Sequence, residues 1–235
     1  MKLFKISFAR LVLIIALVFA KFSFAQSITV LDTTNHEFRK NLEAFYVLKS
    51  EETKLFYKNI EDRKTRKEVE SDVNEFKDDF IKEIKAGYFV DEKKYADRVD
   101  AIFQTIQKAN PEIQNMKLLV KLGDEVNAYN FGEDIVVIYL KFIQEIGNEY
   151  QLAFTVSHEI AHQLLNHAKK RLVKQAAINN SDALKQETKA IQKQKYNKAK
   201  SASLLHKRMV YGNREESRKR EISADSLGYK LFKKA

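Results

Sequence analysis

The 235-residue chain contains no cysteine. Disulfide bridges, zinc sites built on thiolates and a cysteine nucleophile are therefore excluded. Any metal ion must be held by histidine and carboxylate side chains. Only five histidines are present, and His158, His162 and His167 lie close together in the sequence.

Proline and glycine are also scarce, with one and six residues, while 31% of the chain is charged. This composition favours an α+β protein that is mainly helical, and the length suits one domain with an extension. Beyond the N-terminus no apolar run approaches the roughly 20 residues of a membrane-spanning helix.

Residues 1–25 resemble an export signal. Four basic and no acidic side chains occur there, residues 11–20 form an apolar core, and Ser23-Phe24-Ala25 is a typical cleavage site. We predict a mature chain that begins at Gln26 and is periplasmic or extracellular. An uncleaved signal that anchors the chain is the alternative.

The net charge of +10 falls to +6 without residues 1–25, and much of this excess lies in 168–200. We interpret that segment as a solvated helical face, with peripheral contact to anionic lipid as the alternative. Export and the lack of a recognisable binding motif argue against nucleic acid as a partner.

Helical periodicity predicts three helices between residues 34 and 110, the second ending at Gly87 and the third at Asn110-Pro111. The apolar stripes of the first two helices are expected to face the core, with a partner-binding groove as the alternative. They comprise Phe38, Leu42, Phe45, Leu48, Val69, Val73, Phe76, Phe80 and Ile84.

Two strand-like segments follow, at 116–122 and 135–139, with glycine-containing turns between them. We expect a small sheet whose edge strand can receive an extended peptide through main-chain hydrogen bonds. Residues 168–215 are predicted to be a lysine-rich helical insertion, which Tyr211-Gly212-Asn213 breaks before the helix that carries Glu221.

His158-Glu159-Ile160-Ala161-His162 follows an apolar run, 152–157, that predicts a buried helix. Residues four apart share a helix face, so His158 and His162 can offer imidazole nitrogens to one metal ion. Glu159 lies where a carboxylate can take a proton from a metal-bound water.

A second helical segment, 218–228, carries Glu221 and Asp225 four residues apart. Glu221 is a candidate third metal ligand, and Asp225 a candidate acceptor for the other ring N–H of a ligating histidine. The alternative is an ordinary pair of solvated helix carboxylates.

Together these motifs resemble the M48 metallopeptidases, the family that includes the CAAX protease Ste24, the heat-shock protease HtpX and Oma1. The resemblance covers roughly 95–235. Asn127-Ala128-Tyr129 with the following 135–139 segment is similar to the family's edge strand, and Leu164-Leu165-Asn166-His167 to the tail of its active-site helix.

The resemblance implies a zincin-like metalloprotease domain over 111–235, preceded by a helical region at 26–110. It also implies that His158, His162 and Glu221 bind Zn²⁺, that Glu159 is the general base and that Asp225 orients a ligand.

The expected function is a zinc-dependent endopeptidase acting on polypeptides that are exported or membrane-associated, in protein quality control. The alternative is a non-catalytic binding or chaperone protein of the cell envelope. An oxyanion donor is expected besides zinc, with His206 and Tyr229 as candidates. Because the chain ends ten residues after Asp225, we expect the C-terminal part of the family's domain to be missing.

Overall fold

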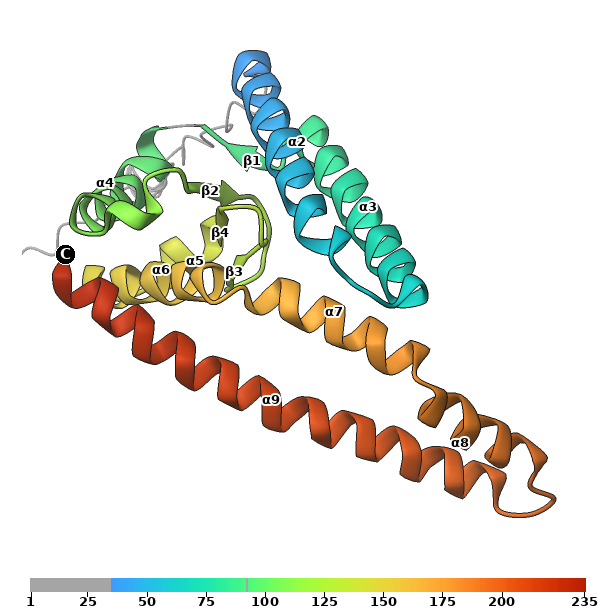
Figure 1. Cartoon of the computed structure of the whole chain (residues 1–235). Coiled ribbons are helices and arrows are strands. Elements are labelled where there is room, and N and C mark those ends of the chain that lie inside the picture. Colours follow the sequence, from blue (N-terminus) through green and yellow to red (C-terminus); the bar gives the residue numbers. More distant parts are fainter. Residues whose placement is uncertain (1–34, 92) are drawn as a thin grey trace, which may run out of the picture. The chain divides into compact units, whose positions relative to one another are not determined.

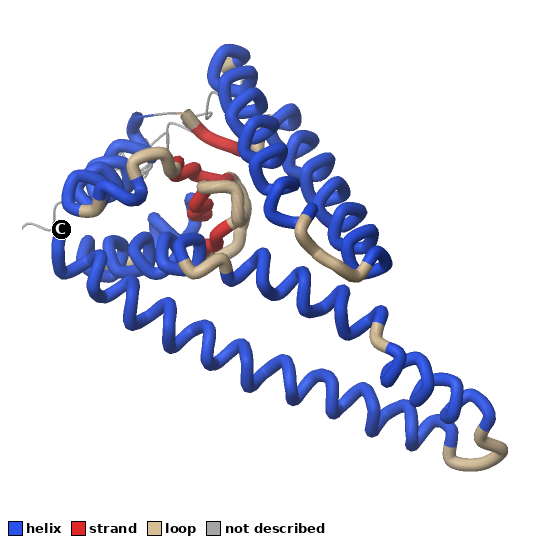
Figure 2. The backbone as a smooth tube through the Cα atoms, in the orientation of Figure 1, coloured by secondary structure: helices blue, strands red, loops and turns tan. Residues whose placement is uncertain are grey.

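Figure 1 shows a computed structural model of the chain, which describes residues 35–91 and 93–235, without the side chains of 93–95 and 210–213. The predicted signal at 1–25 lies outside the described residues. Helices predominate around one small mixed sheet (Figure 2), as the composition predicts. Within the described part of the chain, no helix is both long and apolar enough to cross a bilayer.

The first two helices, α2 (His36–Lys58) and α3 (Arg63–Ala86), pack against each other. Each begins at a capping side chain, since Asn35 accepts from the backbone N–H of Phe38 and Asp62 from that of Thr65. The second helix ends at Gly87, which adopts the left-handed conformation (φ 78°) as expected for a helix C-terminus.

The buried face of α3 agrees with the prediction at Val69, Val73, Phe80 and Ile84, whereas the buried face of α2 differs from the predicted one. Leu48 and Phe76, both expected in the core, are 59% and 54% exposed. The buried stripe of α2 runs instead through two tyrosines and two hydroxyl residues: Leu42, Tyr46, Ser50, Thr53 and Tyr57. Apolar periodicity missed this face because two of its five residues, Ser50 and Thr53, are polar. The hydroxyl of Ser50 donates to the carbonyl of Val47 in its own helix.

The sheet comprises β1 (Phe89–Val90), β2 (Lys117–Lys121), β3 (Ala128–Asn130) and β4 (Ile135–Tyr139) in the order β1-β2-β4-β3. Strands β2 and β4 are parallel, and the outer pairs are antiparallel. All of β4 is buried, as its unbroken apolar sequence indicates. Strand β3 is an edge strand and lies in the segment that resembles the family's edge strand, whereas β4, which belongs to the same segment, is an inner strand. The two-residue β1 was not predicted.

Three shorter elements connect the helices and the sheet: α4 (Lys93–Ala109), the 3-10 turn Pro111–Ile113 and α5 (Leu140–Glu145). The end of α4 at Asn110-Pro111 agrees with the prediction. The Asn110 side chain is buried and donates to the carbonyls of Ile106 and Leu231, at 2.8 and 3.3 Å. It therefore fastens the end of α4 to the last turns of α9 (Lys198–Lys234).

The two helices that carry the predicted site, α6 (Glu149–Leu164) and α9, cross at small residues. Ser157, Ala161 and Ala224 are fully buried there. At Gly228 a Cβ atom would lie 2.9 Å from the Cα of His158, so only glycine allows this approach of the two backbones. The crossing brings the C-terminal half of α9 against the helix that carries His158.

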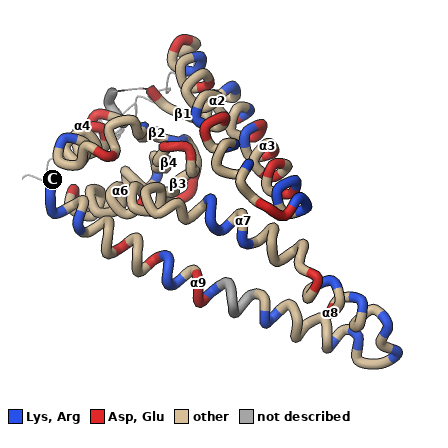
Figure 3. Tube along the Cα trace, in the orientation of Figure 1, with Lys and Arg blue, Asp and Glu red and all other residues tan. Residues whose placement is uncertain are grey.

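Between α6 and α9 the chain forms α7 (His167–Asn180) and α8 (Asp182–Lys193), and Figure 3 shows the many basic residues along them. The predicted break at Tyr211-Gly212-Asn213 is wrong, because α9 runs unbroken from Lys198 to Lys234. One glycine costs a helix only about 1 kcal/mol, which the contacts of the rest of α9 outweigh. The predicted insertion 168–215 therefore does not end at a helix boundary.

Candidate active site

Helix α6 presents His158 and His162 on one face, one turn apart. Their Nε2 atoms lie 2.9 Å from each other, and both side chains are largely buried. The apolar residues on the opposite face of the same helix, Leu152, Val156 and Ile160, are fully buried and hold it in the core. The sequence pattern thus fixes the orientation of both imidazoles.

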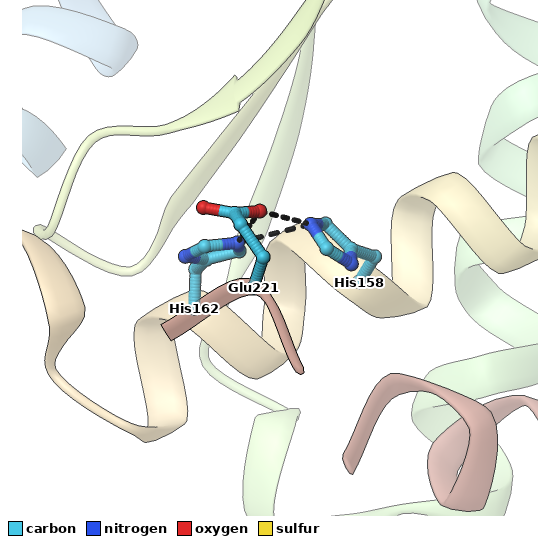
Figure 4. A group of neighbouring side chains, drawn as sticks. All are labelled: His158, His162 and Glu221. Atoms are coloured by element: carbon cyan, nitrogen blue, oxygen red, sulfur yellow. Dashed lines mark hydrogen bonds and ion pairs between the residues drawn. The ribbon is translucent and has the colours of Figure 1, made fainter. Parts of the chain in front are cut away.

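Glu221 reaches the same point from α9. Its Oε2 atom lies 3.4 Å from the Nε2 of His158 and 3.4 Å from the Nε2 of His162 (Figure 4). A tetrahedral ion with bonds of about 2.0–2.1 Å separates its ligand atoms by about 3.3–3.4 Å. Two edges of the observed triangle match this spacing and the third is slightly shorter, so the three residues fit one metal ion.

Asp225 determines which nitrogen of His158 faces this triangle. Its Oδ1 atom lies 2.9 Å from the Nδ1 of His158, one helical turn beyond Glu221. A carboxylate can only accept here, so Nδ1 carries the proton and Nε2 keeps its lone pair. This contact is the one that the sequence predicts.

A chain of hydrogen bonds serves His162 in the same way. The Nδ1 atoms of His162 and His167 lie 3.0 Å apart, and the Nε2 of His167 lies 3.2 Å from the Oγ of Ser223. Ser223 donates its hydroxyl hydrogen to the carbonyl of Arg220 at 2.8 Å, so its oxygen accepts from His167. His167 then accepts from the Nδ1–H of His162, which leaves the Nε2 of His162 unprotonated.

These hydrogen bonds require His162 and His167 to be neutral, and burial favours that state. Burial and the neighbouring His162 lower the pKa of His167 to about 4, and burial lowers the pKa of His162 as well. Three acceptor atoms, the two Nε2 lone pairs and the Oε2 of Glu221, therefore converge. Such a convergence is unfavourable unless a positive charge lies among them.

The turn between α6 and α7 places His167. Asn166 adopts a left-handed backbone conformation (φ 54°), which ends one helix and starts the next. Asparagine tolerates this conformation better than most residues. The sequence contains this signal, but nothing in it shows that the turn directs His167 back to His162.

Glu159 lies in the same cleft, which has a volume of about 270 Å³. Its burial and the negative charge of Glu221 raise the pKa of the Glu159 carboxyl to about 8. The backbone N–H of Asn130, in β3, donates to this carboxylate and acts in the opposite direction. Glu159 thus stands between the edge strand and the two histidines, a place suited to proton transfer.

The free edge of β3 borders this cleft. Tyr129 pairs with Val137, and the N–H of Phe131 donates to the carbonyl of Ile135. The alternation of an antiparallel ladder then turns the backbone groups of Ala128 and Asn130 away from β4. Asn130 does donate outward, to Glu159.

Neither candidate oxyanion donor lines the cleft. His206 precedes Glu221 on the same helix by 15 residues, a distance of about 22 Å at the rise of an α-helix. Tyr229 lies two turns after Glu221 and is 55% exposed. Arg171 and Arg220 line the cleft instead, on α7 and α9.

Comparison with known proteins agrees with this arrangement. The sequence profile of Peptidase family M48 matches residues 93–235, well over half of the chain. The match begins in α4, close to residue 95, where the resemblance of the sequence to the family begins. It contains His158, His162 and Glu221. No curated protein and no solved structure matches. The chain therefore belongs to Peptidase family M48, a family of metallopeptidases.

Proposed function

We propose that this chain is a zinc-dependent endopeptidase in which His158, His162 and Glu221 hold the metal. The observation that carries the proposal is the convergence of three acceptor atoms with edges of 2.9, 3.4 and 3.4 Å. Without cysteine, the donor set is nitrogen and carboxylate oxygen, which is typical of catalytic zinc sites that keep one position free.

Zinc bound there supplies a Lewis acid that polarises a peptide carbonyl and lowers the pKa of water to about 7. Glu159 takes the proton of the attacking water and passes it to the leaving amine. A general base must be ionised, and one cause of its raised pKa is the charge of Glu221. A cation that neutralises Glu221 removes this second cause and lowers the pKa of Glu159, while the larger cause, burial, remains.

The division of roles can be tested with two substitutions. Glu159→Gln keeps the shape of the side chain but cannot accept a proton, so it should leave zinc content unchanged and lower casein cleavage by at least about 10²-fold. His162→Ala should abolish both tight zinc binding and cleavage. Glu149→Gln, an exposed glutamate in the first turn of the same helix, is the matched control.

Three results would contradict the proposal. They are a wild-type protein without zinc by elemental analysis, equal zinc in His162→Ala, and cleavage that survives in Glu159→Gln. Binding of unfolded chains without any chelator-sensitive cleavage would favour the non-catalytic alternative.

We further propose that the substrates are polypeptides of an exported compartment, in protein quality control. The support is the composition of residues 1–25, with its basic start, apolar core and Ser23-Phe24-Ala25. N-terminal sequencing of the protein from its native cell should find Gln26 as the first residue. An intact N-terminus in the membrane pellet would favour an uncleaved anchor. Contact of the basic segment 168–200 with anionic lipid stays a prediction.

A further inference from the structure

A second cavity, of about 400 Å³, adjoins the proposed catalytic cleft. It lies where the β3–β4 turn meets α3 and the start of α7. Its apolar walls are Tyr57, Val73, Phe76, Tyr129, Phe131 and Leu172. Tyr129, Asn130 and Ala168 line both this cavity and the cleft that holds Glu159, so the two spaces share a wall.

The free edge of β3 connects the two spaces. The N–H of Asn130 is taken by Glu159, and a polypeptide that pairs with the outward backbone groups of Ala128 and the carbonyl of Asn130 runs along the cleft past Glu159. Beyond Asn130 the strand leads into Phe131 and Gly132, which belong to the second cavity. A substrate side chain a short distance along the strand from the reacting bond therefore meets this cavity.

We propose that this cavity is a specificity site that takes one large apolar or aromatic side chain of the polypeptide substrate. The proposal rests on the proposed function, because it assigns a substrate class to the same cleft. The volume lies at the lower end of the range for ligand pockets, which suits a single side chain. Burial of a large apolar side chain should improve binding about 10–100-fold over alanine.

The charges around the cavity disfavour a basic side chain. Lys169 and Arg171 also line it, and Lys169 lies over the ring of Phe56 at 5.6 Å. The only acidic residue in the lining is Glu133, which is 9% exposed and faces Thr53 as well as Lys169. A lysine or arginine entering the cavity would pass two cations to reach one buried carboxyl.

Substitutions in the wall of the cavity change its size, and a control substitution outside the cavity shows whether an effect comes from a change in the fold. Phe76→Ala removes an exposed wall residue on α3 without touching the cleft. Ala168→Leu fills space in the wall that the cavity shares with the cleft, because a Cβ atom at Gly132 would lie only 3.6 Å from the Cβ of Ala168. Leu48→Ala, which removes an equally exposed apolar side chain of α2, is the control.

The experiment uses the zinc-loaded Glu159→Gln protein and blocked fluorescent hexapeptides, in which Phe, Leu, Ala, Glu or Lys replaces each position in turn. Affinity is measured by anisotropy. At one position Phe and Leu should bind about 10–100-fold more tightly than Ala. Phe76→Ala should reduce this preference about 3–10-fold, Ala168→Leu should abolish it for Phe, and Leu48→Ala should leave it unchanged.

Four results would each overturn the proposal. They are equal affinities at every peptide position, a preference for Glu or Lys, no measurable peptide binding, and an apolar preference that both Phe76→Ala and Ala168→Leu leave unaltered. Cleavage of casein is measured separately, with the wild-type protein that retains Glu159. If the apolar preference depends on the wall residues but the wild type cleaves no casein, the proposed endopeptidase function is refuted and the specificity site is retained. If the wild type cleaves casein but the preference is absent, only the specificity site is refuted.

Discussion

Gly228 of α9 lies directly against the backbone of His158. A Cβ atom at position 228 would be 2.9 Å from the Cα and 3.0 Å from the N of that histidine. The two helices approach here very closely, and Asp225 and Glu221 stand about one and two turns earlier on α9. The position of the third acceptor of the site therefore depends on a glycine that itself contacts no metal.

Gly228→Ala should consequently weaken zinc binding as well as the fold. The extra methyl group must push α9 away from α6, and overpacking of this kind costs about 1–3 kcal/mol of the free energy of unfolding. The higher helix propensity of alanine offsets up to about 1 kcal/mol. Urea unfolding of the metal-free protein and chelator competition for zinc measure the two effects.

Gly147→Ala is the control for this substitution. A Cβ there would meet only the side chain of Gln151, at 3.7 Å, so the stability should change by less than about 1 kcal/mol. Equal zinc affinity in Gly228→Ala and the wild type would show that the close approach does not position Glu221.

His167 should act on zinc through His162, without binding the metal. His167→Ala removes the acceptor for the Nδ1–H of His162 and should weaken zinc affinity by about 10–100-fold. Ser223→Ala, one hydrogen bond further along, should have a smaller effect. ¹⁵N NMR of the metal-free protein should find His162 protonated on Nδ1 in the wild type and a mixture of tautomers in His167→Ala. An unchanged tautomer would contradict the hydrogen-bond chain.

Asp225→Ala should weaken zinc affinity by a similar factor of about 10–100, because His158 loses the carboxylate that holds its proton on Nδ1. Asp225→Asn keeps an acceptor oxygen and should recover part of the loss. Glu215→Gln changes an exposed carboxylate of the same helix, one that pairs with Lys219, and should have no effect. Chelator competition compares all three variants.

Glu133 should make stability depend on pH. Burial raises the pKa of its carboxyl to about 7, above the unfolded value of 4.5, so the folded state binds more protons between these pH values. The contribution of Glu133 to stability is therefore complete below pH 4.5 and is lost as the pH rises through 7. Between pH 5 and pH 8, the wild type should therefore lose about 2–3 kcal/mol of stability relative to Glu133→Gln.

Urea unfolding of the metal-free protein at the two pH values measures this difference. Glu70→Gln, at an exposed position of α3, should show no such change between pH 5 and pH 8. A Glu133→Gln curve parallel to that of the wild type would mean that the carboxyl titrates alike in the folded and unfolded states.

The sequence by itself determined the features that depend on neighbours along the chain. The spacing of His158 and His162 on an apolar helix fixes two acceptors at one point, since the helix repeat is the same in every fold. The end of α4 at Asn110-Pro111 and the end of α3 at Gly87 follow from local backbone preferences in the same way. The buried strand β4 follows from five apolar residues in a row.

Only the tertiary structure decided the features that depend on contacts between distant segments. Glu221 and Asp225 become neighbours of His158 because small residues let α9 cross α6, and His167 faces His162 because Asn166 turns the chain. The wrong prediction of Leu48 and Phe76 as core residues and the wrong prediction of a helix break at Gly212 have the same physical cause. Packing between helices and strands outweighs the secondary-structure propensity of a single residue by several kcal/mol. The order of residues along the chain does not show which segments pack together.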